Sequence, residues 1–166
     1  MQRKNLSEMP CPVARTLERV GEWWTILILR DSFHGLTRFE QFQKSLGIAP
    51  NMLTRRLNAL EKDGLLARRR YNERPPRYEY VLTAQGRDFY PVLVALFAYG
   101  NRHYAPEGIM SRIVDATTGK PADPILVDRA SGKPIDEAGF GFAAGPAATD
   151  AVHRRMAYAK AARQPR

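Results

Sequence analysis

Apolar residues recur every three or four positions over the first part of the chain, and this spacing predicts four consecutive helices. The first two lie within residues 12–21 and 22–35. The stretch "EWWTILILRDSFHG" (22–35) is almost entirely apolar, so we expect a central buried helix with Trp23 and Trp24 in the core. The third helix lies within residues 37–47, where a glycine follows the last apolar position.

The fourth helix, within residues 48–64, has two different faces. Leu53, Leu57 and Leu60 recur at helical spacing and are predicted to point inward. The polar side chains are predicted to lie on the outer face: Asn51, Thr54, Arg55 and Asn58. Arg56 is predicted to lie nearer the edge of this face.

Residues 65–83 ("LLARRRYNERPPRYEYVLT") predict two strands joined by a tight turn. The adjacent prolines at 75–76 cannot lie in a central strand, so they are expected at an exposed, rigid tip. Thr83 is expected to cap a final long helix over 84–103, in which Pro91 predicts a kink or a late start. The hairpin is rich in cations: Arg68, Arg69, Arg70, Arg74 and Arg77.

The 166-residue chain has 26 Lys and Arg against 17 Asp and Glu, a net charge of +9. Most of this excess, +7 (17 − 10), belongs to residues 1–106, which indicates an anionic partner for that part. The longest apolar run is far shorter than the roughly 20 residues that a membrane span needs. With one cysteine and no secretion signal at the start, we expect a cytoplasmic protein without membrane contact.

This order of elements is that of a winged helix-turn-helix: helix, helix, glycine turn, polar-faced helix, then a charged hairpin. The expected fold class is mainly α with a β-wing (α+β). A helix fits the major groove of DNA, where Asn and Arg read adenine and guanine, and an arginine-bearing hairpin contacts phosphates or the minor groove. We therefore expect the outer face of the fourth helix to meet bases or nearby phosphates. Phosphate anchors are predicted at Arg56, Arg38 and Lys44, and wing contacts at Arg74 and Arg77.

The sequence resembles the HxlR-type bacterial transcriptional regulators over about residues 9–104. The resemblance rests on "CPVARTLERVGEWWTILILRD", "RFEQFQKSLGIAPNMLTRRLNALEKDGLLARRRY", "RPPRYEYVLTAQG" and "PVLVALFAYG". It implies a homodimer that pairs through helices 12–20 and 84–103. Two copies would meet half-sites roughly 34–36 Å apart, so the operator would be an inverted repeat of double-stranded DNA. The resemblance leaves open whether control is by repression or activation. Members of this family often control genes for detoxification or electrophile stress.

Cys11 stands where the family typically has a cysteine, which in some members is oxidised or alkylated. A thiol near a helix start and close to Arg15 would have a lowered pKa. Cys11 is therefore a candidate redox sensor, next to the alternative of a small residue packed at the dimer interface. The same resemblance implies that a small molecule or a redox change acts as the inducer.

Two other functions stay open at this point. An arginine-rich hairpin can be a solvated edge, and a winged helix can be a protein- or RNA-binding adaptor without sequence-specific readout of DNA. An enzyme with a Cys11 nucleophile is a third, weaker alternative. No catalytic residue, metal site or cofactor is predicted, because the three histidines are scattered and no C-x-x-C occurs.

The sequence changes character after Pro106, where "VDATTGKP" (114–121) and "VDRASGKP" (127–134) repeat with a period of 13. Each predicts a turn closed by side-chain to backbone hydrogen bonds. Some longer relatives of the family end in a zinc-ribbon-like hairpin, and here Asp with Thr or Ser replaces its cysteines. The expected domains are a DNA-binding and dimerisation domain (9–105), a metal-free β-turn appendage (106–149) and a basic tail (150–166).

Overall fold

The computed structural model describes residues 5–162. Two compact units divide them: one is Thr16–Arg112, and the other contains residues 5–15 and 113–162. The helices and strands follow in the order α1 (Pro12–Val20), α2 (Trp23–Phe33), α3 (Phe39–Leu46), α4 (Pro50–Lys62), β1 (Leu66–Asn72), β2 (Arg77–Leu82), α5 (Ala84–Arg87), α6 (Tyr90–His103) and α7 (Asp150–Ala162).

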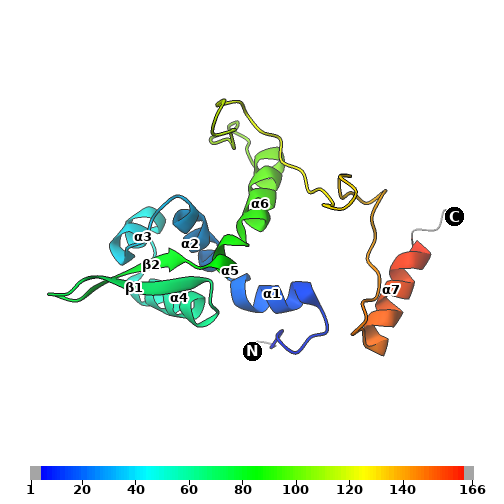
Figure 1. Ribbon diagram of the computed structural model, residues 1–166, viewed down its shortest axis with the longest axis horizontal. Helices are drawn as coiled ribbons and strands as arrows, with labels where there is room; N and C mark the ends of the chain where they lie inside the picture. Colours follow the sequence, from blue (N-terminus) through cyan, green and yellow to red (C-terminus); the bar gives the residue numbers. More distant parts are fainter. Residues whose placement is uncertain (1–4, 163–166) are drawn as a thin grey trace. The chain divides into compact units, whose positions relative to one another are not determined.

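The core of the larger unit lies among α2, α3, α4 and the base of the hairpin (Figure 1). Phe42 is fully buried between the helices, and the predicted stripe Leu53, Leu57 and Leu60 faces inward. The two faces predicted for the fourth helix are therefore confirmed. Each leucine buried there contributes about 1.5–3 kcal/mol through removal of apolar surface from water.

β1 and β2 pair antiparallel and project beyond the helices as a narrow hairpin (Figure 1). The segment before α3 pairs with β2 through one isolated β-bridge between Arg38 and Glu79, and the amide of Tyr80 donates to the carbonyl of Thr37 at 2.7 Å. This pairing connects the start of α3 directly to the hairpin. The expected fold class, mainly α with a β-wing, is confirmed.

The helix predicted over residues 84–103 is divided into α5 and α6. Thr83 caps α5 as expected, since its Oγ1 accepts a hydrogen bond from the amide of Gly86 at 3.0 Å. Pro91 lies in the first turn of α6, where its missing N–H is harmless, so the late start is confirmed.

The prediction that both tryptophans lie in the core is wrong for Trp23. Trp24 packs against the core, whereas the side chain of Trp23 is 71% exposed at the first position of α2. The stretch is apolar all round, and this composition alone does not show which of two neighbouring tryptophans points outward.

The smaller unit contains the two repeats as isolated turns. The Asp115 carboxylate accepts hydrogen bonds from the amides of Thr117 and Thr118, and Asp128 accepts from Ala130 and Ser131. These hydrogen bonds lower the pKa of both aspartates. Turns held by side-chain to backbone bonds were expected here, and this expectation is confirmed.

The remainder of the smaller unit is loop and helix. The tail predicted over 150–166 forms α7 as far as Ala162, and its last four residues lie outside the described part. The division of the chain into domains 9–105, 106–149 and 150–166 stays a prediction.

Candidate nucleic-acid interface

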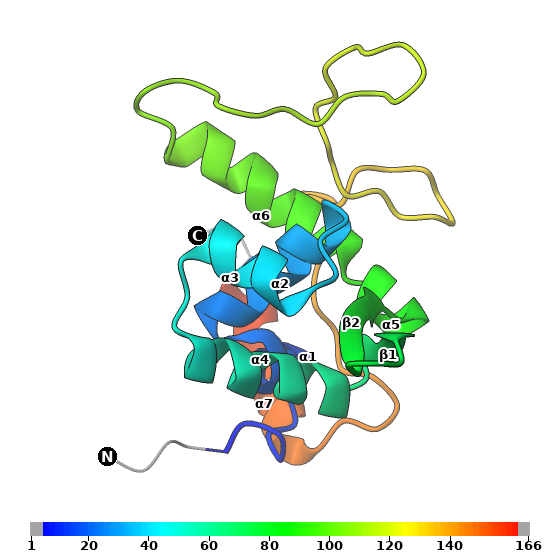
Figure 2. The ribbon, with the colours of Figure 1, turned by 90° about the vertical axis from the view of Figure 1, so that its left-hand side faces the viewer.

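A tight turn joins α3 to α4 and sets the angle of the second helix. Gly47 ends α3 in the left-handed conformation (φ 60°), which a glycine adopts without steric cost. Pro50 occupies the first turn of α4, where proline is compatible with a helix start. Figure 2 views the unit from the side of the hairpin tip, and α3, α4 and the hairpin can all be seen from there.

The outer face of α4 presents polar side chains to solvent. Asn51, Thr54, Arg55 and Asn58 are all exposed. The hydroxyl of Thr54 donates to the carbonyl of Pro50 at 3.0 Å, so its donor is satisfied within the helix. Within the described residues, the guanidinium of Arg55 makes one hydrogen bond, to the sulfur of Met52 at 3.1 Å. The amides and the guanidinium are therefore displayed for an external partner.

Arg56 does not belong to this exposed face. Its guanidinium donates to the Glu22 carboxylate at 2.7 Å, and its side chain is only 13% exposed. The assignment of Arg56 to phosphate stays a prediction. In the structure its ion pair with Glu22, 34 residues earlier in the chain, connects α4 to the start of α2.

Three arginines of the hairpin are engaged within the hairpin itself. Arg69 pairs with Glu79 at 2.8 Å, Arg70 pairs with Glu73 at 3.1 Å, and Arg68 lies 3.8 Å from the centre of the Tyr78 ring. These contacts hold cations along the strands.

The two predicted wing residues, Arg74 and Arg77, are both exposed. Arg74 lies in the turn and Arg77 begins β2. The side-chain amide of Asn72 donates to the carbonyl of Pro75 at 2.9 Å and closes the turn. The hairpin therefore has a defined tip with cationic side chains.

The predicted phosphate anchors on α3 are exposed as well. Lys44 lies in the last turn of α3. Arg38, just before α3, stacks over the Tyr71 ring at 4.5 Å from its centre, which restricts the side chain without removing it from solvent.

Sequence reasoning missed the residues that orient these cations, namely Glu22, Tyr71 and Tyr78. The alternation of arginine and tyrosine between residues 68 and 80 was an available signal, because guanidinium groups stack on aromatic rings.

Cys11 belongs to the smaller unit and is half-buried just before α1. The amide of Ala14 stabilises the thiolate and lowers its pKa; the amide of Val13 and the Arg155 charge act in the same direction. Arg155 of α7 also donates to the carbonyl of Pro10 at 3.1 Å. The basic residue beside the thiol is thus Arg155, whereas the sequence indicated Arg15.

Two features are absent from residues 5–162. No helix there is long and apolar enough to cross a membrane. No three His, Cys, Asp or Glu side chains gather there as a metal site would require.

A helix pair with an exposed polar second helix, followed by a cationic hairpin, defines a winged helix-turn-helix DNA-binding protein. The profile of the HxlR-like helix-turn-helix family matches residues 19–108, more than half of the chain. The chain therefore belongs to the HxlR-like family of transcriptional regulators.

Relatives of known sequence or structure agree with this assignment. An HTH-type transcriptional regulator of Mycobacterium tuberculosis, Rv3095, is 42% identical over 74% of this chain and 78% of its own. A solved structure of a proposed transcription factor from Pseudomonas aeruginosa is 52% identical and covers 87% of this chain and 99% of that one, with a TM-score of 0.63. The redox regulator HypR in its reduced form is 33% identical over 58% of this chain and 99% of that one, with a TM-score of 0.53.

Proposed function

We propose that this protein is a sequence-specific transcriptional regulator that binds inverted-repeat DNA as a homodimer. The observation that carries the proposal is the composition of α4. Its inward face is leucine, and its outward face displays Asn51, Arg55 and Asn58 to solvent. Asparagine amides and guanidinium groups pair bidentately with adenine and guanine edges in the major groove.

The surroundings of α4 supply cations for phosphate contacts. Arg38 and Lys44 lie at the two ends of α3, and Arg74 and Arg77 lie on the wing. Phosphate contacts position a protein on the duplex without reading its sequence. We assign these four residues to positioning and the outer face of α4 to base readout.

Exposed apolar side chains on two helices support a homodimer. α1 exposes Val13 and Leu17, and α6 exposes Val92, Leu96 and Tyr99, each by 46% or more. Large exposed apolar side chains along helices mark surfaces that a partner covers. We assign both surfaces to a second copy of the chain, with the helices predicted over 12–20 and 84–103 forming the interface.

The experiment that tests this function is selection from a pool of random duplex DNA by the purified protein. An enriched inverted repeat with half-sites roughly one helical turn apart is the expected result. Binding without enrichment, weakened only by salt, would instead favour the adaptor alternative, because phosphate contacts alone carry no sequence preference.

We further propose that Cys11 responds to oxidants or electrophiles. Its thiolate is stabilised by the amide of Ala14 and by the charge of Arg155. The similarity to the redox regulator HypR gives independent support. Repeating the selection with oxidised and reduced protein tests this role, and an operator enriched equally in both states would contradict it.

A further inference from the structure

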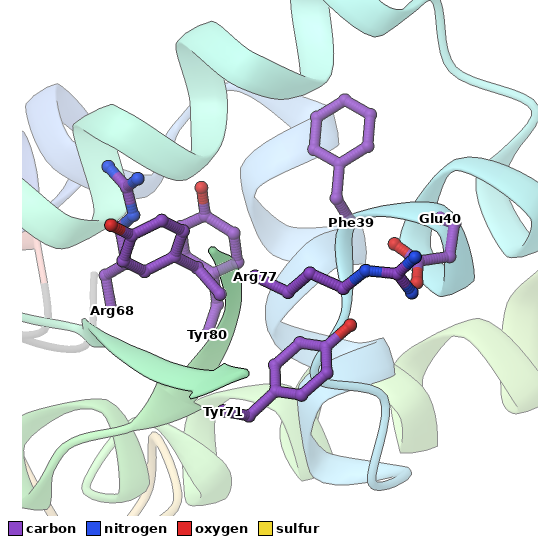
Figure 3. A pocket seen from close by; sticks show the side chains of 7 residues that line it. Phe39, Glu40, Arg68, Tyr71, Arg77 and Tyr80 are labelled. Carbon is purple, nitrogen blue, oxygen red and sulfur yellow. The ribbon is translucent and has the colours of Figure 1, made fainter. Parts of the chain in front are cut away.

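A hollow of about 440 Å³ lies between the start of α3 and the hairpin. Figure 3 shows Arg77 extended between the rings of Phe39 and Tyr71, with its guanidinium on the side of Glu40. Tyr80 lies on the opposite side of the hollow from Glu40. All of these residues belong to the larger unit, so the hollow is formed within one compact body.

The walls of the hollow are aromatic. Phe39, Tyr71, Tyr78 and Tyr80 all line it. Tyr80 is half-buried against the core, and this desolvation raises its pKa. Aromatic walls stack planar rings in offset or tilted arrangements, and a volume of this size is typical of small-molecule sites.

The charge of the lining favours an anion. Arg68 and Arg77 contribute two positive charges, and Glu40 contributes one negative charge. Arg68 already stacks on the Tyr78 ring. The ion pairs found in the described part of the chain engage Arg30, Arg56, Arg69 and Arg70. Arg77 is in none of them, so its guanidinium can pair with the carboxylate of a ligand. A guanidinium binds a carboxylate through two parallel hydrogen bonds.

We propose that this hollow binds a small aromatic carboxylate, with the ring stacked on the aromatic side chains that line the hollow and the carboxylate on Arg77. The proposal has a second part, that the ligand regulates DNA binding, and this part rests on the proposed function. Arg77 is also a wing contact for DNA, so a ligand on its guanidinium removes that contact and weakens operator binding.

Benzoate is the probe that tests the site, added to the full-length protein without DNA and followed by the NMR signals of labelled tyrosine rings. We expect saturable binding in the millimolar range, as suits a ligand of about nine non-hydrogen atoms. Benzamide lacks the charge and cyclohexanecarboxylate lacks the aromatic ring, and each should bind at least tenfold more weakly.

Arg77→Gln and Arg74→Gln form a matched pair, since both remove an exposed wing arginine and only Arg77 lines the hollow. Arg77→Gln should weaken benzoate binding at least tenfold, and Arg74→Gln should change it less than twofold. Equal binding by both variants, or no saturable binding by the wild-type protein, would overturn the site.

The regulatory part is measured separately on operator DNA. Saturating benzoate should raise the Kd for operator at least threefold, and it should have no effect on the Arg77→Gln protein. An unchanged Kd with benzoate bound would overturn this part. The operator selection itself contains no benzoate, so its failure would reject the proposed function and leave the ligand site standing.

Discussion

Arg55 is the exposed guanidinium at the centre of the outer face of α4. We expect Arg55→Ala to weaken operator binding by about 1–3 kcal/mol if this side chain reads a base. Binding to random DNA should change much less, because a base contact contributes only at its own sequence. Fluorescence anisotropy with both duplexes measures the two losses. Equal losses would reassign Arg55 to a phosphate.

The thiol of Cys11 is the second residue whose chemistry can be measured directly. Its pKa is lowered first by the amide of Ala14, then by the amide of Val13 and after that by Arg155, so the thiolate persists to lower pH than for an ordinary cysteine. Alkylation by iodoacetamide should therefore reach half its maximal rate below the usual pH. Arg155→Gln should move this midpoint upward and slow the reaction at neutral pH, because the charge of Arg155 lowers the Cys11 pKa.

Arg154→Gln is the control for this measurement, because Arg154 is the neighbouring exposed cation on α7 and no contribution from it to the Cys11 pKa is found. A similar shift in both variants would show that general charge, and not the position of Arg155, sets the reactivity.

At the scale of elements, the junction between the hairpin and α5 depends on close backbone approach. A Cβ at Gly86 would overlap the carbonyl oxygen of Leu65, which is backbone and cannot rotate away. Gly86→Ala should therefore destabilise the protein by about 1–3 kcal/mol and lower the Tm by several degrees.

Gly145→Ala is the matched control, because a Cβ there would meet nothing within 4 Å and Gly145 lies outside the proposed interface. It removes a flexible residue from a loop and should leave stability unchanged or raise it by up to about 1 kcal/mol. Thermal unfolding at one protein concentration compares the variants. Equal effects of the two substitutions would mean that the contact with Leu65 relaxes without cost.

Local patterns were sufficient to predict most elements, and their limits have a physical reason. The leucine stripe of α4, the glycine after α3 and the prolines of the hairpin each act within a few residues, so sequence spacing revealed them. The ion pair between Arg56 and Glu22 joins residues 34 positions apart, and no local pattern encodes it. The candidate site was predicted as a set of exposed polar residues, whereas the rings that orient its arginines depend on strand register.

At the scale of the whole molecule, the assembly is the property to measure. Leu96 is 47% exposed on α6, and a charge there would be buried if a second copy covers this surface. We expect Leu96→Glu to convert a dimer into a monomer in sedimentation velocity. Affinity for the full operator should fall by about 100-fold or more, because the two half-sites no longer bind as one unit.

Ile125→Glu is the control, since Ile125 is also exposed but lies in the loop region between the two turns. It should leave the sedimentation coefficient and operator affinity unchanged. A monomeric wild-type protein, or a dimer that survives Leu96→Glu, would contradict the proposed interface.

The division of α4 into a leucine face with Arg56 on one side and Asn51, Arg55 and Asn58 on the other has an evolutionary consequence. The residues that hold the helix in place are separate from those that face outward. A duplicated copy of the gene can therefore substitute the three outward positions at little expense in folding stability. New operator preferences can arise on an unchanged scaffold, and a lineage can build many regulators from one inherited framework.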